Sequence, residues 1–440
     1  MEWYVVLILL VGMLVILILS GLPVAFSFFI VNFAFMMILN DPAVGARVMV
    51  LSIYDSLTKF ILAPVPLFVI MGELLFHSGL AVRSLDVLSK WLGRTPGRLS
   101  IMATGGGALL GMLSGSTMAS TAVLSRSLVP EMQKRGYSPL MITGPIMASG
   151  GLAMMIPPSA LAVILGSLGQ ISIAGLLIGG ILPGFLMAVL YLVYIVCRCH
   201  FNPHLAPVYD IEHTPLKEKI FVFIRDVLPM GSLIFLVTGL ILLGIATPTE
   251  AAGTGALGAF LLTFCYRRLN YDVLVRSLRG TLQVTGMAFL IIAGSAGFSQ
   301  LIAFTGTGRG LIVFLMELQL SSIIVLIMMQ VTLLILGTFM DQTSIMMITL
   351  PLFMPIVHAF GFDPVWFGIL MLICLEIGLS TPPFGLILFV MKGTLPAGSN
   401  ISMGQIYRSA MPFVLCDLIS LLLIMVFPAI ALWLPGFMAR

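Results

Sequence analysis

Charged residues are scarce in this chain. Only 9% of its 440 residues are Asp, Glu, Lys or Arg, whereas 60% are hydrophobic. A water-facing surface needs many more charges, so this composition excludes a soluble fold. Apolar stretches of about 20 residues, long enough to cross a bilayer, recur from end to end. Runs such as Leu233 to Ile245 are apolar on almost every face, which excludes alternating barrel strands and predicts an all-α polytopic membrane protein.

Cysteine is also rare, and the five cysteines form neither a CxxC motif nor a Cys/His cluster with metal-ligand spacing. We therefore expect free thiols and no structural metal. Paired Asp residues, a Ser/His dyad and a His/Glu metal site at membrane depth are missing too, so we expect neither an enzyme nor a cofactor. The N-terminal segment from Met1 to Leu19 lacks a basic start and a small-residue cleavage site, which predicts a retained membrane helix.

The chain contains an internal repeat with one constant spacing in the numbering, so that position 157 in the first copy corresponds to position 382 in the second. Prolines and glycines fix backbone geometry, so their coincidence in one register carries more weight than matched leucines. On this basis we divide the chain into a first repeat (1–200), a cytoplasmic linker (201–221) and a second repeat (222–440). The matched residues are Pro157 and Pro158 with Pro382 and Pro383, Pro130 with Pro355, Pro23 with Pro248, and Gly72 with Gly297.

Basic residues indicate that the repeats are inverted. Loops on the cytoplasmic side of a membrane protein carry an excess of Lys and Arg. The segment 83–98 has four basic residues, whereas the matching segment Thr305 to Leu320 has only Arg309 beside Glu317. The two segments are therefore predicted to lie on opposite sides. Each repeat then contains an odd number of crossings, about five, and one segment that enters and leaves on the same side.

Two places in each repeat cannot be continuous transmembrane helix. Residues 98–134 start and end on the basic side, which predicts a re-entrant hairpin with its tip near Ser114 to Thr117, and its mate has its tip near Gly337 to Ser344. The double prolines break a second span in each repeat and leave carbonyls free. Such carbonyls and hydroxyls suit sodium, whereas the starts of half-helices attract an anion. We therefore predict two cation sites with a substrate site between them.

Each polar residue considered for function can also have a purely structural role. Asp341 is a functional candidate because an ionisable residue deep in an apolar stretch is costly. Glu73 and Glu376 are equally open to a role as cation or proton groups and to a role as structural partners. Glu250 follows Thr247-Pro248-Thr249 and is predicted to be a first-turn helix residue. Any single Ser or Thr in a membrane helix can also simply bond to the preceding turn.

Several motifs together resemble the large membrane subunit of tripartite ATP-independent periplasmic (TRAP) transporters. The resemblance covers essentially the whole chain. The segments that carry it include GLPVAF, GMLSGSTMASTAV, ASGGLAMMIPPSALAVILG, ATPTEAAGTGALGA, GTFMDQTSIMMITLPLFMPI and STPPFGLILFV. The resemblance implies a sodium-coupled importer of an organic acid anion, such as a C4-dicarboxylate or sialic acid, in the bacterial inner membrane.

The resemblance also implies partners, a mechanism and site residues. The partners would be a small four-helix membrane subunit, expected here as a separate polypeptide, and a soluble periplasmic binding protein. Hairpins and broken helices would move against a scaffold in elevator fashion, with sodium near the hairpin tips. By position, the sodium-site residues would be Ser114, Gly115, Ser116, Gly150 and Pro157 for one site and Asp341, Gln342, Thr343, Gly378 and Thr381 for the other. Substrate candidates are Thr117, Ser159 and Arg126.

Three other functions stay open at this point. A sodium/dicarboxylate carrier that works alone would share the hairpins and the broken helices and would differ only in needing no partner. A channel is less suited to symmetric broken helices, and an intramembrane enzyme lacks its catalytic residues. The transported acid is not determined by the sequence.

Overall fold

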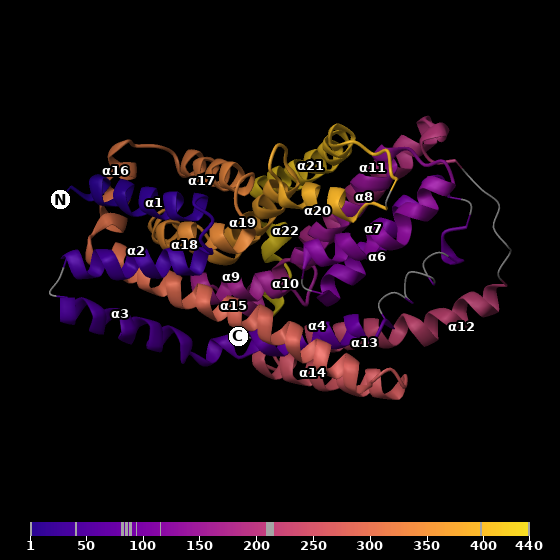
Figure 1. Ribbon diagram of the computed structural model, residues 1–440, viewed down its shortest axis with the longest axis horizontal. Coiled ribbons are helices and arrows are strands. Elements are labelled where there is room, and N and C mark those ends of the chain that lie inside the picture. The colour runs from indigo at the N-terminus through magenta and orange to yellow at the C-terminus, as the bar shows by residue number, and fades with distance from the viewer. Residues whose placement is uncertain are drawn as a thin grey trace.

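The computed structural model describes residues 2–39, 42–80, 83, 87, 90–93, 95–114, 116–207, 215–396 and 398–438, and in this part of the chain all regular structure is helical (Figure 1). The first half contains α1 (Trp3–Leu19), α2 (Val24–Leu39), α3 (Pro42–Leu57), η1 (Phe60–Leu62), α4 (Pro64–His77), α6 (Arg98–Ser114), α7 (Thr117–Lys134), α8 (Pro139–Met155), α9 (Ala160–Gly169), α10 (Ile173–Gly179) and α11 (Ile181–Phe201).

The second half continues the series. It contains η2 (Pro203–Leu205), α12 (Leu216–Asp226), α13 (Leu228–Leu242), α14 (Pro248–Cys265), α15 (Tyr271–Phe304), α16 (Thr307–Glu317), α17 (Ser322–Gly337), α18 (Gln342–Ala359), α19 (Pro364–Ser380), α20 (Leu386–Thr394), α21 (Met403–Val426), α22 (Ala429–Leu432) and η3 (Pro435–Phe437).

The offset between the repeats recurs in these helix bounds. The first and last residues of α7 and α18 are separated by this same offset, and so are those of α8 and α19. The peptide bonds Pro157-Pro158 and Pro382-Pro383 are both cis and follow the same spacing. Both double prolines therefore interrupt a helix at the predicted place. The domain limits stay a prediction, because residues 208–214 of the linker lie outside the described residues and the linker's last residues, from Leu216, belong to α12.

The two hairpins approach each other from opposite ends of the long axis (Figure 1). In the first, α6 packs on α7, and the amide of Leu99 donates a 3.4 Å hydrogen bond to the hydroxyl of Tyr137, so the start of α6 lies beside the end of α7. In the second, α17 packs on α18. The tips meet near the middle of the molecule, which is the arrangement that inverted repeats predict.

Each hairpin lies against the broken helix of its own half. Helix α6 packs on α8, and α17 packs on α19. Small residues allow close approach: a Cβ on Gly337 would lie 2.7 Å from the Cα of Gly378. Helices α8 and α19 are buried along almost their whole length, from Met141 to Met155 and from Trp366 to Ser380. The hairpins and broken helices therefore form one packed body, hereafter called the core.

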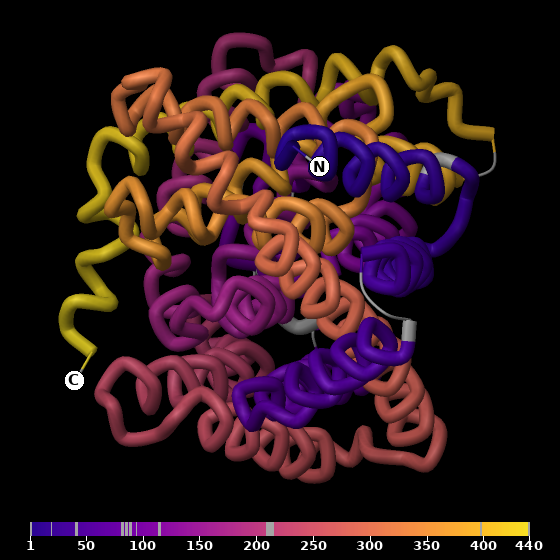
Figure 2. The backbone as a smooth tube through the Cα atoms, turned by 90° about the vertical axis from the view of Figure 1, so that its left-hand side faces the viewer, coloured from indigo at the N-terminus to yellow at the C-terminus, as the bar shows by residue number. Residues whose placement is uncertain are grey.

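The first helices of each half pack on the other half. Helix α2 packs on α15, whereas α14 packs on α4. The side-chain amide of Asn32 donates a 2.7 Å hydrogen bond to the carbonyl of Gly294 and fixes the first of these contacts. Figure 2, viewed along the long axis, shows α3 and α13 at the edge opposite to α17 and α21. We call α1–α4 and α13–α15 the frame, because these helices join the two halves to each other: α2, α3 and α4 pack on α15, and α4 also packs on α14.

Membrane-spanning helices are evident from length and composition. Among the described residues, five helices are long and apolar enough to cross a membrane, or up to seven if each of two bent pairs is one span. One bent pair is α8 with α9, at 47°. Four shorter apolar helices accompany them, so the number of crossings per repeat stays a prediction. The protein is a multi-pass helical membrane protein.

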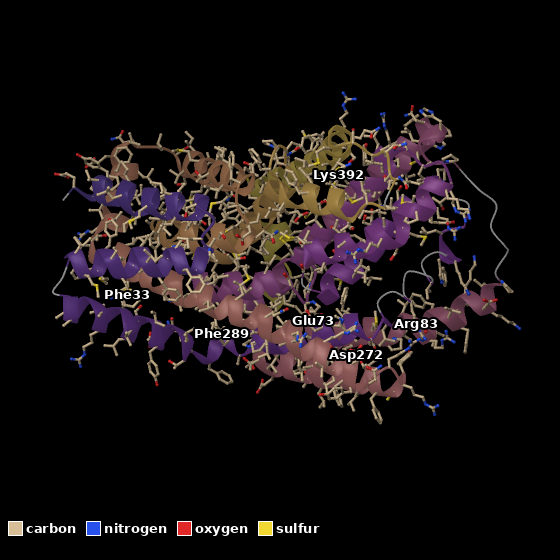
Figure 3. All side chains as sticks on the ribbon, in the orientation of Figure 1. Phe33, Glu73, Arg83, Asp272, Phe289 and Lys392 are labelled. Carbon is tan, nitrogen blue, oxygen red and sulfur yellow. The ribbon has the colours of Figure 1, made fainter. Side chains whose placement is uncertain are left out.

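Figure 3 locates several side chains along the long axis, and the contacts of others test two of the local predictions. Arg83, Asp272 and Lys392 lie in the same half of the view in Figure 3, and Phe33 lies in the other half. Glu250 is confirmed as a first-turn residue, because its carboxylate and the Thr247 hydroxyl form a capping box at the start of α14. All five cysteines are free thiols.

Candidate functional site

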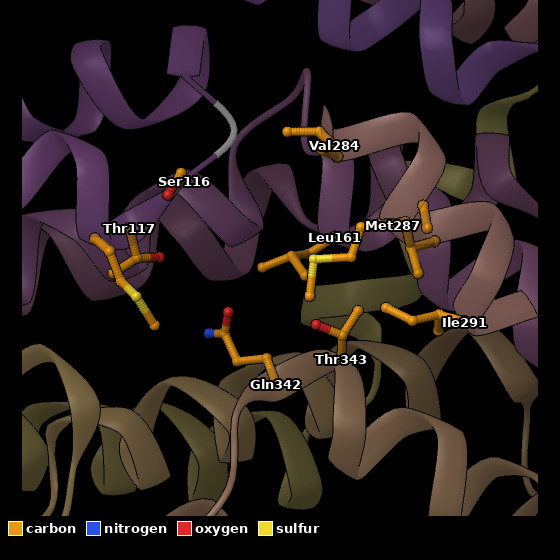
Figure 4. A pocket seen from close by; sticks show the side chains of 12 residues that line it. Ser116, Thr117, Leu161, Val284, Met287, Ile291, Gln342 and Thr343 are labelled. Atoms are coloured by element: carbon orange, nitrogen blue, oxygen red, sulfur yellow. The ribbon is translucent and has the colours of Figure 1, made fainter. Parts of the chain in front are cut away.

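A cavity of about 190 Å³ lies where the tips of both hairpins meet the start of α9 and one face of α15. Figure 4 shows Ser116 and Thr117 on one side of it and Gln342 and Thr343 on the opposite side. The cavity therefore joins the residues that the sequence predicted at the two tips, although they belong to different halves of the chain. Its lining consists of Ser116, Thr117, Met118, Ala160, Leu161, Ile164, Val284, Met287, Ala288, Ile291, Gln342 and Thr343.

Three helices begin at this cavity. Thr117 is the first residue of α7, Ala160 of α9 and Gln342 of α18, and all three line the cavity. The first amides of a helix have no partner within the helix, and the aligned peptide dipoles place about half a positive charge there. Three helix starts therefore place partial positive charge at the cavity, whose lining residues carry no charge, although at α18 the carboxylate of the capping residue Asp341 offsets it.

The residues just before these helices explain why each helix begins where it does. The hydroxyl of Ser116 accepts a 3.3 Å hydrogen bond from the amide of Ala119, and the hydroxyl of Ser159 accepts one of 3.2 Å from Ala162. Serine and aspartate are favoured at this position because their oxygens satisfy an otherwise free amide. Each cap leaves other first-turn amides available to a ligand.

Asp341 caps the third helix, α18. Its carboxylate accepts hydrogen bonds from the amides of Thr343 at 3.1 Å and Ser344 at 3.2 Å, and from both of their hydroxyls. The side chain is therefore turned onto its own helix, and Asp341 is not among the residues that line the cavity. Its partners satisfy the half-buried carboxylate that made Asp341 a candidate in the sequence. Its predicted role in sodium binding stays a prediction.

The first predicted sodium site surrounds the break between α8 and α9. The Thr117 hydroxyl donates a 3.3 Å hydrogen bond to the carbonyl of Gly150, so the start of α7 rests on α8. Gly150 and Pro157 are buried. Gly115 and the side chain of Ser114 lie outside the described residues.

The second predicted sodium site surrounds the end of α19. The hydroxyl of Thr381 donates a 2.5 Å hydrogen bond to the carbonyl of Ile377, and Gly378 lies against Gly337 of the hairpin. Gln342 lines the cavity, and its amide nitrogen lies 3.0 Å from the sulfur of Met154 on α8. Both broken helices thus contact the tip of the second hairpin.

The three substrate candidates occupy different places. Thr117 lines the cavity, Ser159 is buried directly before the lining residue Ala160, and Arg126 is exposed on α7 and outside the lining. No basic residue lines this cavity, so any positive potential there comes from the helix starts.

The sequence did not identify one face of α15 as part of the cavity. Val284, Met287 and Ile291 supply its apolar side, and they resemble any other lipid-facing or core residues in the sequence. Glu73, whose role the sequence left open, has its Oε2 3.0 Å from Nε2 of His77 one turn later and faces Gly280 of α15. This contact supports a role for Glu73 as a structural partner.

The same fold occurs in a solved structure. The chain superposes on the crystal structure of the YdaH transporter of Alcanivorax borkumensis with a TM-score of 0.60, at 15% identity, over 90% of either chain. At this identity the likeness shows the fold alone.

The family follows from the sequence comparison. Residues 11–430 match the family model "Tripartite ATP-independent periplasmic transporter, DctM component", and the chain belongs to this family. It is 31% identical to the uncharacterised protein YgiK of Salmonella typhimurium, over 100% of this chain and 99% of that one. It is 30% identical to the C4-dicarboxylate TRAP transporter large permease protein DctM of Pseudomonas aeruginosa, over 90% of each chain. The protein is therefore a large permease subunit of a transport family rather than an enzyme.

Proposed function

We propose that this chain imports an organic acid anion, a C4-dicarboxylate or a similar carboxylate, together with sodium. The observation that carries the proposal is the cavity at which α7, α9 and α18 all begin. Free first-turn amides and the helix dipoles stabilise a carboxylate without a basic side chain. A site without fixed charge also releases its anion more readily than an ion pair with Arg would, which suits a transporter.

Sodium coupling is supported by the broken helices beside this cavity. Helix α8 ends at Met155 and α19 at Ser380, and each break leaves carbonyls without helical partners. Carbonyl and hydroxyl oxygens are ligands of hard cations. An anion in a low-dielectric cavity is costly unless a cation compensates it, so closure around the substrate favours binding of both ions together.

The two-part architecture supports an elevator movement. The core contains both hairpins and both broken helices, whereas the frame interlocks the two halves through the α2–α15 and α4–α14 contacts. Movement of the core against the frame would expose the cavity to either side in turn. We further propose the bacterial inner membrane as the location, a separate small membrane subunit as one partner and a periplasmic binding protein as the other.

Uptake into proteoliposomes tests the proposal. Radiolabelled organic acids would be offered with and without a sodium gradient, the small subunit and the binding protein. Uptake only with all three supports the tripartite function. Sodium-driven uptake by the chain alone would instead favour the single-component carrier, and uptake that persists unchanged without sodium would refute the coupling.

A matched pair of variants tests the cavity itself. Gln342→Leu removes the only amide side chain from the lining, whereas Gln300→Leu makes the same change on the exposed face of α15, outside it. We expect Gln342→Leu to raise the KM for the acid about tenfold, which corresponds to loss of one hydrogen bond of about 1.4 kcal/mol. Gln300→Leu should behave as wild type. Equal kinetics for both variants would place the substrate elsewhere.

A further inference from the structure

A second cavity lies between the frame and the core. Its volume is about 340 Å³, and it is bordered by the end of α3, by η1, by the end of α9 and by the second half of α15. Nine of its fifteen lining residues are polar, against four of twelve in the cavity at the hairpin tips. Polar and ionisable groups within a membrane protein are costly and mark functional places. We call this cavity the vestibule, and its polar lining includes Asp55, Lys59, Ser167, Ser295 and Ser299.

The vestibule lies at the end of α15 that is far from the basic loops. Helix α15 begins shortly after Arg267 and Arg268, and such basic residues mark the cytoplasmic side. Its 34 residues rise about 50 Å, which is enough to cross a bilayer. Ser299 and Ala303, which line the vestibule, are close to its last residue, Phe304. The positive-inside rule therefore places the vestibule towards the external side.

A third cavity, of about 530 Å³, adjoins the vestibule. The two share four lining residues, among them Gln170 and Ser299. The third cavity extends to the start of α16 and the end of α18, where it is lined by Arg309 and His358, and none of its described lining residues is acidic. An anion that approaches through this cavity would therefore meet a basic side chain before it reaches the vestibule.

The same two helices line the vestibule and the cavity at the hairpin tips. On α9, Ile164 lines that cavity and Ser167 lines the vestibule, about one turn later. On α15, Ile291 lines the cavity, and Ser295 and Ser299 follow in the vestibule at spacings of four residues. Residues at this spacing share one face of a helix, so this face of α15 changes from apolar to hydroxylated towards the vestibule. Both isoleucines are buried and form an apolar barrier between the two spaces.

Lys59 lies in the vestibule beside the middle of α15. It follows α3 and precedes α4, and both of these helices pack on α15 (Figure 1). A Cβ added at Gly297 of α15 would contact Met49 of α3, whereas one added at Gly280 would contact Glu73 of α4. Lys59 comes between Met49 and Glu73 in the chain and therefore lies between these two contacts, at membrane depth.

The partner of Lys59 holds it only weakly. Its amine is 3.9 Å from the carboxylate of Asp55, one turn earlier, and the two side chains are 45% and 79% exposed. An exposed pair at this distance contributes little, so an arriving carboxylate can replace Asp55. A lysine at membrane depth that lines a polar cavity is suited to receive an anion.

We propose that the vestibule is the external entrance for the acid anion, and that Lys59 receives the anion there before it reaches the cavity at the hairpin tips. Arg309, Lys59 and the helix starts then follow one another as positive features along the path. Lys59 belongs to the frame, so a core that moves away with the anion leaves this charge behind. The proposal rests on the proposed import of an acid anion, whereas the access of water and small ions to the vestibule does not.

Thiol labelling from outside tests the entrance. Ser299→Cys places a thiol in the vestibule, and the control Ser321→Cys places one at an exposed position before α17, outside all three cavities. In right-side-out membrane vesicles, a membrane-impermeant anionic thiosulfonate should label both variants above the wild-type background of native thiols. Labelling should inhibit uptake only in Ser299→Cys. If Ser321→Cys is labelled from outside and Ser299→Cys is not, the vestibule is not an external entrance.

The charge of Lys59 is tested through the labelling rate of the same thiol. In the Ser299→Cys protein, Lys59→Gln should slow labelling by the anionic reagent, relative to a cationic reagent of the same chemistry, by about twofold or more, and Asp55→Asn should shift this ratio the other way. Arg47→Gln, an exposed charge change on α3 outside the cavities, and Gln300→Leu, a neutral change in the vestibule lining, should both leave the ratio unchanged. An unchanged ratio in Lys59→Gln would contradict the role of Lys59.

Uptake kinetics connect this charge to transport. Lys59→Gln should raise the KM for the acid about fivefold at low ionic strength, the effect should shrink in high salt, and Lys59→Arg should retain the wild-type KM. Arg47→Gln should match wild type. If wild type imports the acid and Lys59→Gln has the same KM at every ionic strength, the inference fails and the proposed function stands. If no form imports an acid, wild type included, the proposed function fails, and the labelling ratios still decide whether anions enter the vestibule at Lys59.

Discussion

A close approach between two backbones in the core gives a sharp test of how the second hairpin is held. A Cβ on Gly337, the last residue of α17, would lie 2.7 Å from the Cα of Gly378 on α19. Ordinary contacts of a Cβ begin at about 3.4 Å. The neighbour is backbone and not the end of a flexible side chain, so α17 and α19 must separate if Gly337 is replaced by Ala.

The expected cost of Gly337→Ala follows from this geometry. Overpacking of a tight interior costs about 1–3 kcal/mol. Gly239 on α13 provides the control, because an added Cβ would meet no atom within 4 Å there. Alanine in a helix interior is favoured over glycine by about 1 kcal/mol, so Gly239→Ala should be neutral or stabilising. The two variants should therefore differ by roughly 2–4 kcal/mol in the free energy of unfolding.

The assay is thermal unfolding in detergent, followed by uptake in proteoliposomes. We expect a lower Tm and reduced uptake for Gly337→Ala, because a displaced α17 also moves Gln342 and Thr343 at the cavity. Gly239→Ala should match or exceed the wild-type Tm and transport normally. If Gly337→Ala is as stable as Gly239→Ala, the hairpin does not rest on α19 at this distance and the reasoning is refuted.

Three more predictions concern the frame and the surface. Asn32→Leu removes the hydrogen bond to the carbonyl of Gly294 and should destabilise the frame by about 1–3 kcal/mol in an unfolding assay; an unchanged stability would show that the bond contributes nothing. The pKa of Glu250 is lowered first by the backbone amide of Thr247 and then by its hydroxyl, and Thr247→Ala removes the hydroxyl alone. A lowered pKa gives stability that is present at neutral pH and lost as the pH falls through it. We therefore expect the variant to be less stable than wild type at neutral pH, with the difference shrinking in acid. Arg126→Gln should leave the KM for the acid unchanged, since Arg126 is exposed outside the cavity, and a raised KM would restore it as a substrate ligand.

The sequence by itself determined the features that depend on local chemistry. Scarcity of charge required membrane helices, and the double prolines at 157–158 and 382–383 had to interrupt a helix because proline lacks an amide donor. Ser116 and Asp341 mark the starts of α7 and α18 for the same kind of local reason, since each caps its own helix. The repeat could be recognised in the sequence because these features recur at one offset.

Only the tertiary structure decided which of these elements meet. The starts of α7, α9 and α18 are spread over both halves of the chain, and their convergence on one cavity depends on how α8 and α19 pack. The apolar face of α15 was equally hidden, because Met287 lines the cavity only through neighbours on other helices that are distant in the sequence. Local sequence fixes where a helix starts and ends, whereas close packing between distant helices selects the residues that share a site.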